Sequence, residues 1–376
     1  MEKIARKIYI KILTDLEKKM VFVVGPRQVG KTWLSKKVMG EYKNPLYLNY
    51  DDMDHVKILK TKAWKPEVDL IVFDEIHKMP KWKNYIKGIY DTKPDTLHML
   101  ITGSARMDTF RKAGDSLTGR FFIHHLMPFS LSELKGTYLE NDIHTLIKRS
   151  GFPEPLFLER DEDANRWRST YADTLIRQDV LEFNDIQKVV AMRQVYNILK
   201  NKIGSPVSYA NIARDIDTSP KTVKKYIEIL ESLYVIFILK PHTGKINRSI
   251  LKEPKIYFFD YGVIDDEGAR FENFVALSLY KNITTTNDLT GSSVSLSFLK
   301  TRDQKEVDFA ISDKNELKEI IEVKVSDNKL SGPLKYFSEK YNVKGTQLVK
   351  YARVEQMLGS NIQLRSADKY LSELDW

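Results

Sequence analysis

Apolar residues in the first third of the chain gather in short runs that alternate with amphipathic stretches. Runs of strand length occupy residues 20–24, 46–48, 70–73 and 97–101. Nearly continuous apolar runs suit strands that are buried on both faces, as in a parallel sheet covered by helices. We therefore expect such a sheet over residues 20–130. Residues 1–19, where charged and aliphatic residues alternate, predict an amphipathic helix ahead of it.

Further along the chain the pattern changes twice. Residues 131–204 have helical spacing, interrupted at 151–155 by a stretch that contains glycine and proline. Residues 208–217 and 221–234 then predict two helices joined by a turn at 218–220, and strands follow at 235–240 and 256–259. This is the outline of a winged helix-turn-helix. The remainder predicts a helix at 270–280 and strands at 293–299, 306–311 and 319–325.

Composition narrows the class of protein only a little. The 376-residue chain has 60 basic and 51 acidic residues, and its net charge of +9 leaves nucleic acid open as a partner. The sequence contains no cysteine, which excludes disulfides, cysteine-ligated metals and thiol catalysis, and this fits the cytoplasm, where we expect the protein to be. No apolar run approaches the ~20 residues of a membrane helix, so we expect no membrane partner.

The first apolar run leads directly into GPRQVGKT at residues 25–32, which fits the phosphate-binding pattern G-x-x-x-x-G-K-[ST] at every fixed position. Its glycines let backbone N–H groups approach phosphate oxygens, and a helix start follows. We expect Lys31 to reach the β- and γ-phosphates of ATP and Thr32 to bind Mg²⁺. The expected nucleotide-binding residues are Gly25, Pro26, Arg27, Gln28, Val29, Gly30, Lys31, Thr32 and Trp33.

Two further strands end in polar residues that suit the same chemistry. The run at 70–73 ends in Asp74, which we expect to hold Mg²⁺, and in Glu75, which we expect to polarise the attacking water. Without the preceding loop, this pair would be read as a solvated strand end. The run at 97–101 leads to Thr102 and Ser104. Ser104 or Thr102 is expected either to sense the γ-phosphate or to cap a helix.

Arg106 and Arg120 are candidates for an arginine finger, since a guanidinium can neutralise charge that develops on the γ-phosphate. The alternative for each is an ordinary surface arginine. Arg120 is the one we place in the catalytic set, together with Lys31, Asp74, Glu75 and Ser104.

Six segments together resemble one family. They lie at residues 25–32, 70–78, 101–106, 119–134, 151–155 and 254–263, and they are similar to the AAA-type ATPases of bacteria and archaea that carry a C-terminal DUF4143 domain. This resemblance implies ATP binding and hydrolysis. By analogy with AAA proteins it also implies a homo-oligomer, and a hexamer is one form that it could take.

The helix-turn-helix region, residues 205–256, has nine basic against five acidic residues. Its expected exposed positions Lys221, Thr222, Lys224 and Lys225 would face a DNA groove if the region binds DNA. The alternative is a winged helix that packs against protein or covers the ATPase, because helix-turn-helix geometry alone does not read bases.

Carboxylates and a lysine recur near the C-terminus in a pattern that suits a metal. Residues two apart on a strand share a face, so Glu322 and Lys324 project together, and Asp308 can come level with them on a neighbouring strand. Glu272 on the preceding helix could add another carboxylate. Such a group suits a divalent cation that activates water.

This C-terminal pattern resembles the PD-(D/E)xK nuclease core of archaeal Holliday-junction resolvases and many restriction endonucleases. The resemblance implies that Glu272, Asp308 and Glu322 bind metal and that Lys324 is catalytic. The alternatives are a salt-bridged hairpin or a nuclease fold without activity.

These observations predict an α/β protein with four regions. We expect a P-loop AAA-type ATPase domain over residues 1–135, a helical lid or connector over 136–204, a winged helix-turn-helix over 205–256 and a restriction-endonuclease-like α/β domain over 257–376. The expected function is Mg²⁺-dependent ATP hydrolysis coupled to the processing of duplex or branched DNA. The alternative is a nucleotide-gated regulatory switch whose nuclease-like domain is inactive.

Overall fold

The computed structural model describes residues 6–103, 117–140, 142–181, 186–242, 253–326, 329–350, 352 and 355–374. By their internal contacts they form two compact units. The first comprises Met1–Pro128 with Ser232–Tyr234, and the second comprises Phe129–Glu231 with Val235–Trp376. Each unit has its own sheet and its own hydrophobic core, and each is therefore described separately.

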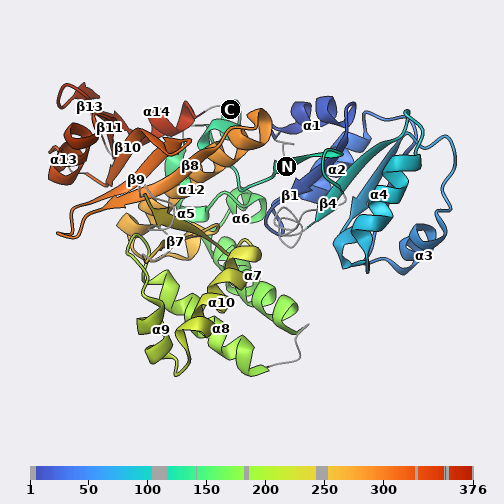
Figure 1. The fold of residues 1–376 in the computed structure, drawn as a ribbon, viewed down its shortest axis with the longest axis horizontal. Coiled ribbons are helices and arrows are strands. Elements are labelled where there is room, and N and C mark those ends of the chain that lie inside the picture. The colour runs from blue at the N-terminus through green and yellow to red at the C-terminus, as the bar shows by residue number, and fades with distance from the viewer. Residues whose placement is uncertain are drawn as a thin grey trace. The chain divides into compact units, whose positions relative to one another are not determined.

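The first unit is built on a parallel sheet of five described strands in the order β2-β3-β4-β1-β5. Figure 1 labels β1 and β4 of this sheet. The strands are β1 (Met20–Val24), β2 (Pro45–Asn49), β3 (Leu70–Asp74), β4 (His98–Gly103) and β5 (Phe121–His125). The four strands predicted from apolar runs are confirmed, with ends that differ by one or two residues. β5 carries two histidines and was not predicted.

Helices cover both faces of this sheet. On one face pack α1 (Tyr9–Leu16) and α2 (Lys31–Met39), and on the other pack α3 (Met53–Thr61) and α4 (Trp82–Thr92), with the short 3₁₀ helix η1 (Ile76–Lys78) after β3. Alternate residues of β1 serve the two cores: Val21 and Val23 face α1 and α2, whereas Phe22 and Val24 face the opposite core. This explains why the strand is apolar at every position.

The strand order brings the expected chemistry to one edge of the sheet. β4 lies between β1 and β3, with Val21 beside Leu100 and Leu70 beside His98. Because the strands are parallel, the loop that follows β1 and the acidic pair that follows β3 leave the sheet at the same edge.

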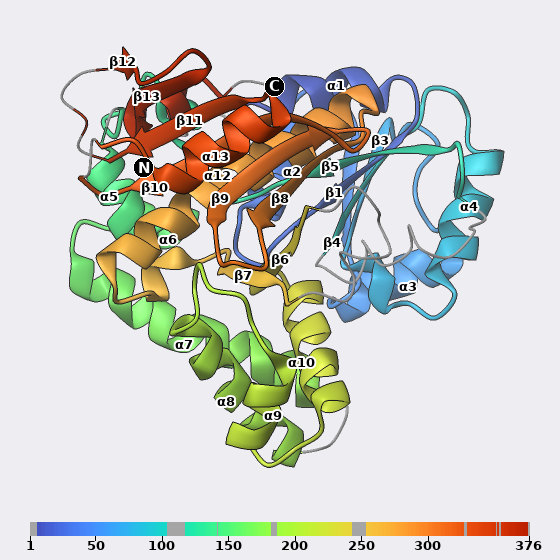
Figure 2. The same cartoon turned by 60° about the vertical axis from the view of Figure 1, so that its left-hand side comes forward.

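The second unit begins with helices. They are η3 (Leu131–Leu134), α5 (Ile143–Arg149), α6 (Pro153–Phe157), α7 (Asp161–Leu181), α8 (Ile186–Lys200), α9 (Tyr209–Asp215) and α10 (Pro220–Ser232). Figures 1 and 2 both show α8, α9 and α10 gathered in one lobe, with α9 next to α10. The predicted helix-turn-helix pair is thus present. Ser219 caps α10, since its Oγ accepts the Thr222 N–H at 3.1 Å.

The sheet of the second unit has the described strands in the order β12-β13-β11-β10-β9-β8-β6-β7. The strands are β6 (Ile236–Pro241), β7 (Lys255–Phe258), β8 (Val294–Lys300), β9 (Glu306–Asp313), β10 (Glu316–Lys324), β11 (Lys344–Val349), β12 (Gln356–Met357) and β13 (Ile362–Ser366). The two strands expected as a wing, β6 and β7, pair with each other and join this sheet through β8, so the sheet extends across the boundary expected at residue 256.

Three helices and one 3₁₀ turn accompany this sheet, namely η4 (Tyr261–Val263), α12 (Glu267–Thr290), α13 (Gly332–Tyr341) and α14 (Ala367–Ser372). α12 is longer than the predicted 270–280 segment. Its first turn is capped by the Asp266 carboxylate, which accepts the Ala269 N–H at 2.7 Å, and it ends at Gly291, whose φ of +69° suits glycine. α13 buries Leu334 and Phe337 in the core of the sheet.

Candidate functional site

The loop after β1 is packed against the backbone of the same unit. Gly25 has a φ of +148°, and a Cβ placed on it would lie 2.0 Å from the Leu126 carbonyl oxygen. Gly30 has a φ of +101° and stands at the start of α2. Both positions therefore require glycine, one for space and both for backbone conformation. The pattern G-x-x-x-x-G is thus explained by the local geometry of the loop.

The lysine of the loop turns back across it. Lys31 Nζ donates to the carbonyl oxygens of Gly25 at 2.9 Å and Pro26 at 2.6 Å. The side chain is buried, although the neighbouring Thr32 and Trp33 are exposed. An ammonium held over a loop of backbone N–H groups is suited to the binding of phosphate oxygens.

Asp74, at the end of β3, is held by three hydroxyl groups. Thr102 Oγ1 donates to Oδ1 at 2.6 Å, while Tyr47 Oη at 2.5 Å and Thr32 Oγ1 at 3.2 Å donate to Oδ2. Neutral donors orient the carboxylate without cancelling its charge. The Thr32 hydroxyl and the Asp74 carboxylate are hard oxygen ligands at the mouth of the loop, and this donor set fits Mg²⁺.

Tyr47 was not predicted from the sequence. It lies in the middle of β2, where a tyrosine reads as an ordinary strand residue. Burial, followed by the hydrogen bond to Asp74, raises the pKa of its phenol, so the hydroxyl stays protonated as a donor. Only the pairing of β2 with β3 brings this hydroxyl to the carboxylate. Thr102, in turn, contacts Asp74 rather than capping a helix.

Glu75 follows in a backbone conformation that is uncommon for a residue with a side chain, with a φ of +54°. Burial, and then the charge of Asp74, raises the pKa of its carboxyl, while Lys31, Lys78 and Arg27 oppose that rise. His77 Nε2 lies 3.5 Å and Lys78 Nζ 3.9 Å from Glu75 Oε2. A carboxylate with a raised pKa is suited to accepting a proton.

The remaining predicted residues of this unit fall in different places. Val29 is buried, Arg27 is half-buried and Gln28 is exposed in the loop. Ser104 and Arg106 lie outside the described residues. Arg120 precedes β5, and its carbonyl oxygen accepts the N–H of Met20, the first residue of β1. It is therefore at the amino edge of the sheet, opposite the phosphate-binding loop, and its guanidinium pairs with Asp91 at 2.7 Å.

In the second unit, α10 buries Val223, Tyr226, Ile227 and Leu230 on one side. Lys221, Lys224 and Lys225 are exposed. Thr222 is engaged locally, with its Oγ1 at 2.8 Å from Ser219 Oγ. The helix is thus amphipathic, and its exposed side carries these lysines together with Glu228, which lies 3.8 Å from Lys224.

The expected register of the C-terminal hairpin is confirmed. β9 and β10 are antiparallel with Phe309 beside Ile321, which brings Asp308 level with Glu322. The Val323 N–H donates to Asp308 Oδ2 at 2.9 Å, and Lys324 Nζ lies 2.8 Å from Glu322 Oε1. The two carboxylates and the ammonium named from the sequence therefore come together on one hairpin.

A second lysine, which the sequence did not point to, stands among the same acids. Lys255 at the start of β7 is fully buried. Its Nζ lies 2.7 Å from Glu306, 3.5 Å from Asp308 and 3.7 Å from Glu272. Burial alone would lower the pKa of Lys255, but the three carboxylates raise it above its usual value, so the group is an ammonium. Within the described residues, no three acidic or histidine side chains are arranged to hold a metal ion.

Two acids of this cluster have perturbed pKa values. Burial, and then the charge of Asp308, raises the pKa of Glu272 to about 7 and that of Glu322 to about 7. Lys255 offsets part of the rise in the pKa of Glu272, and Lys324 offsets part of the rise in that of Glu322. Glu306 differs, since contact with Lys255 and Lys300 outweighs burial and lowers its pKa. The cluster thus has more acid than its lysines neutralise.

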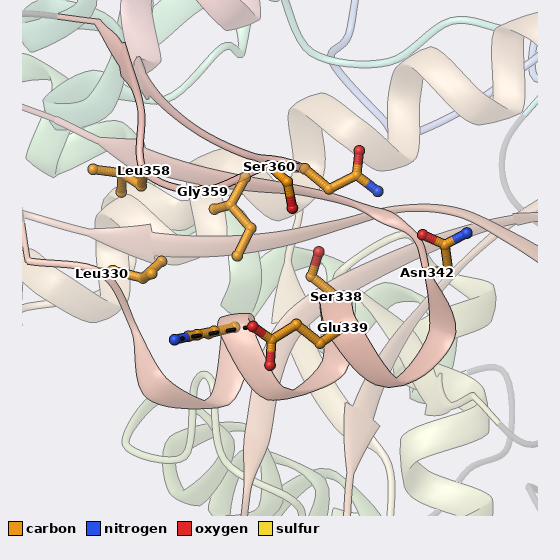
Figure 3. Close-up of a pocket in the computed structure, with 10 residues that line it drawn as sticks. Leu330, Ser338, Glu339, Asn342, Leu358, Gly359 and Ser360 are labelled. Atoms are coloured by element: carbon orange, nitrogen blue, oxygen red, sulfur yellow. Dashed lines mark ion pairs between the residues drawn. The ribbon is translucent and has the colours of Figure 1, made fainter.

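A separate groove of about 440 Å³ lies between α13 and the loop before β13 (Figure 3). Leu330 and Leu358 give it apolar walls, and Ser338, Asn342 and Ser360 give it polar ones. Its charged groups, Lys335 and Glu339, pair with each other at 3.9 Å. It has no group arranged for catalysis among the described residues.

None of the helices in the described ranges combines the length and the apolarity that are required to span a lipid bilayer.

The fold and the site define an α/β protein with a P-loop ATPase-type sheet and a second, sheet-containing domain. Residues 17–135 match the sequence model of an AAA domain, residues 140–265 that of a domain of unknown function, DUF8612, and residues 267–366 that of another, DUF4143. The chain therefore carries an AAA-type P-loop domain followed by a DUF4143 domain.

Similar proteins add little about activity. An uncharacterized protein of Mycobacterium tuberculosis is 26% identical over 272 residues, which cover 68% of this chain and 61% of the relative. An uncharacterized protein of Methanocaldococcus jannaschii is 22% identical over 334 residues, covering 72% of this chain and 69% of that protein. The chain thus spans about three fifths of the length of the mycobacterial relative.

Solved structures with partial likeness include a Walker-type ATPase of Pyrococcus abyssi. It is 15% identical, covers 68% of this chain and 93% of its own, and has a TM-score of 0.45. A RuvB variant of Thermotoga maritima is 17% identical, with coverage of 62% and 89% and a TM-score of 0.34. At these scores neither likeness bears on what this chain does.

Proposed function

We propose that this chain binds and hydrolyses ATP with Mg²⁺ and that DNA is the partner which its nucleotide cycle serves. The observation that carries the ATPase part is the Asp74 carboxylate, anchored by the hydroxyls of Thr32, Tyr47 and Thr102 beside the phosphate-binding loop. A carboxylate oriented in advance at this place is what phosphoryl transfer needs.

Each residue has a role that follows from its contacts. Thr32 and Asp74 would hold Mg²⁺, which when bound neutralises charge on the phosphates. Lys31 would exchange its bonds to the Gly25 and Pro26 carbonyls for bonds to phosphate oxygens. Glu75 would accept a proton from the attacking water, a role that its raised pKa favours.

The DNA part rests on α10. Lys221, Lys224 and Lys225 are exposed, while the opposite side of the helix is anchored in the core of the lobe. A helix with three exposed lysines after a short turn is suited to phosphate contacts along a groove, with duplex or branched DNA as the ligand. Contacts of this kind weaken steeply as salt rises.

A finger role for Arg120 would need a second copy of the chain. Arg120 lies at the edge of the sheet opposite the phosphate-binding loop, so as a finger it would act on the nucleotide of a neighbouring copy and not on its own. We therefore propose a homo-oligomer, in which Arg120 would exchange Asp91 for the neighbour's γ-phosphate. Turnover per chain should then rise with protein concentration.

The test is ATP turnover with Mg²⁺, measured without DNA, with linear duplex and with a four-way junction. We expect saturable ATP binding, Mg²⁺-dependent turnover and a change in turnover on DNA addition at low salt. If ATP does not bind, the whole proposal is wrong. If ATP turns over but DNA neither binds nor alters the rate, the DNA part is wrong and the nucleotide-gated switch becomes the better description.

The DNA contact has its own matched variants. Replacement of Lys221, Lys224 and Lys225 by alanine should weaken DNA binding at least tenfold and flatten its salt dependence. The control replaces Lys57, Lys60 and Lys62, which are exposed on or just after α3, and changes the net charge equally. Equal losses in both variants would show that the effect is bulk charge and not a site on α10.

A further inference from the structure

Lys255 stands where the resemblance to PD-(D/E)xK nucleases would place a metal among carboxylates. Glu272 comes from α12, Glu306 and Asp308 come from β9, and the ammonium of Lys255 lies within 3.7 Å of all three. The aromatic ring of Phe298 closes another side, with its centroid 5.3 Å from Nζ. The ammonium is thus enclosed by acidic oxygens and a ring face, as a buried cation must be.

The oxygens expected to bind metal are also engaged by other groups of the chain. Asp308 Oδ2 accepts the Val323 N–H, Glu272 Oε1 accepts the Tyr257 hydroxyl at 2.7 Å, and Glu322 Oε1 faces Lys324. Of the three expected ligands, Glu322 retains one buried oxygen, Oε2, without a hydrogen-bond partner. Each of the three expected ligands thus already has a partner within the chain, whereas Mg²⁺ needs several oxygen ligands at about 2.0–2.1 Å.

The backbone closes over Glu272 as well. Gly204 has a φ of +73°, and a Cβ placed on it would lie 2.5 Å from Glu272 Oε2. The segment before α9 therefore lies close to this carboxylate, in a backbone conformation that favours glycine. A hydrated cation could not enter from that side without displacing the segment.

A divalent cation at Asp308 and Glu272 would also stand within a few ångströms of the Lys255 ammonium. Two positive charges at that separation repel strongly when they are shielded from water. The residues present therefore do not fit a metal while Lys255 keeps its place. This conclusion differs from the resemblance, which implied that Glu272, Asp308 and Glu322 are metal ligands.

We propose that the Lys255 ammonium is a built-in cation that takes the place of a divalent metal in the DUF4143 domain. The carboxylates of Glu272, Glu306 and Asp308 serve to hold this lysine, and the domain keeps the form of a nuclease centre without its metal. Removal of the ammonium would leave three facing carboxylates, which a divalent cation could bridge once they close around it.

The test measures Mn²⁺ binding to the nucleotide-free full chain by electron paramagnetic resonance. We compare wild type with Lys255→Met, and with Lys300→Met as the matched control. Lys300 also pairs with Glu306, at 2.9 Å, but its side chain reaches solvent. Lys255→Met should gain one Mn²⁺ per chain with at least tenfold higher affinity than wild type, and Lys300→Met should gain none. Mn²⁺ that binds at the phosphate-binding loop of the first unit is the same in all three proteins and does not affect the comparison.

A folded Lys255→Met that gains no Mn²⁺ overturns the proposal. If that variant folds only when Mn²⁺ is present, the proposal is supported, because metal then replaces the ammonium. If Lys255→Met does not fold at all, Mn²⁺ binding by the wild-type chain tests the proposal instead. Asp308→Asn should leave the Mn²⁺ bound by the wild type unchanged, and a loss of one Mn²⁺ per chain on that substitution would overturn the proposal.

Discussion

Each unit of the molecule gathers acidic side chains and lysine at one end of a sheet, yet the two centres are built in opposite ways. In the first unit, the oxygens of Asp74 accept from the hydroxyls of Tyr47, Thr32 and Thr102. In the second unit, Asp308 and Glu306 face the ammonium of Lys255. Hydroxyl donors orient a carboxylate and leave its charge available, whereas an ammonium neutralises it. The same residue types therefore prepare one centre for a ligand cation and fill the other.

The position of the lysine shows the same contrast. Lys31 donates to two backbone carbonyls, and such neutral acceptors can be exchanged for phosphate oxygens. Lys255 is held by three carboxylates in a buried place, and loss of such a partner leaves uncompensated charge. A lysine near acids thus indicates a binding site only when its present partners are weaker than the ligand that would replace them.

Among the tests of this contrast, substitution of Glu75 is expected to have the largest effect. Glu75→Gln keeps the size of the side chain and removes its ability to accept a proton, so turnover should fall by about 10²–10⁴-fold while ATP stays bound. Single-turnover hydrolysis and fluorescent-nucleotide titration measure the two parts separately. Asp54→Asn, an exposed acid in the first turn of α3, is the control. Full activity in Glu75→Gln would remove Glu75 from the chemistry.

Lys31→Ala comes next. Loss of the ammonium that faces the loop should lower turnover by about 10²–10³-fold, as expected for one preorganised electrostatic group, and should weaken ATP binding. The matched control is Lys36→Ala, since Lys36 is exposed on the same helix. Equal activities of Lys31→Ala and the wild type would contradict the assignment of this loop to nucleotide.

A smaller effect is expected for Tyr47→Phe, which removes one hydroxyl from Asp74 and leaves the ring. Hydrogen bonds to charged groups contribute about 1.5–3 kcal/mol, so the Mg²⁺ concentration required for half-maximal turnover should rise about tenfold or more. Maximal turnover at saturating Mg²⁺ should change less. Tyr42→Phe is the control, since that phenol lies near Asp69, ahead of the first residue of β3. An unchanged Mg²⁺ requirement would show that Tyr47 does not position Asp74.

The raised pKa values of acids in the second unit should make the stability of the protein depend on pH. The pKa values of Glu272 and Glu322 rise from 4.5 to about 7 in the folded protein. Between these values the folded state holds more protons than the unfolded state, so stability should fall as pH increases from about 4.5 to 7. The slope is at most about 1.4 kcal/mol per pH unit for each proton retained. Denaturant unfolding of the full chain, followed at several pH values, measures it.

Glu322→Gln tests the source of this slope, because a neutral amide cannot titrate. Its stability should vary less with pH than that of the wild type. Glu316→Gln, which alters an exposed acid on the same strand, should keep the wild-type slope. A stability that rises with pH in this interval would contradict the direction of both pKa shifts.

The sequence was most informative where a local pattern has one structural explanation. GPRQVGKT at 25–32 predicted a loop whose glycines are required by backbone geometry, and this is what Gly25 and Gly30 show. The apolar runs predicted four strands of the first sheet, because residues buried on both faces leave a continuous signature. β5 escaped prediction, since a strand that contains His124 and His125 lacks that signature.

The local sequence pattern was less informative about which side chains contact each other in the folded protein. The alternation of side chains along strands predicted that Asp308 can come level with Glu322, and the structure confirms it. Tyr47 lies 27 residues from Asp74 and Lys255 lies 53 residues from Asp308, and nothing in the sequence around either residue indicates these contacts. Their roles depend on which strands pair, as β2 does with β3 and β6 does with β7 and β8.

By itself, the amino-acid sequence determined the phosphate-binding loop, the acidic strand end and the amphipathic helices, since each depends on residues that are neighbours along the chain. Only the tertiary structure decided which donors meet each carboxylate. These partners distinguish Asp74, whose charge stays available to a ligand, from Asp308, whose charge is neutralised by Lys255. The physical reason is that electrostatic interactions depend on distance in space and on burial, and neither is set until the sheets have formed.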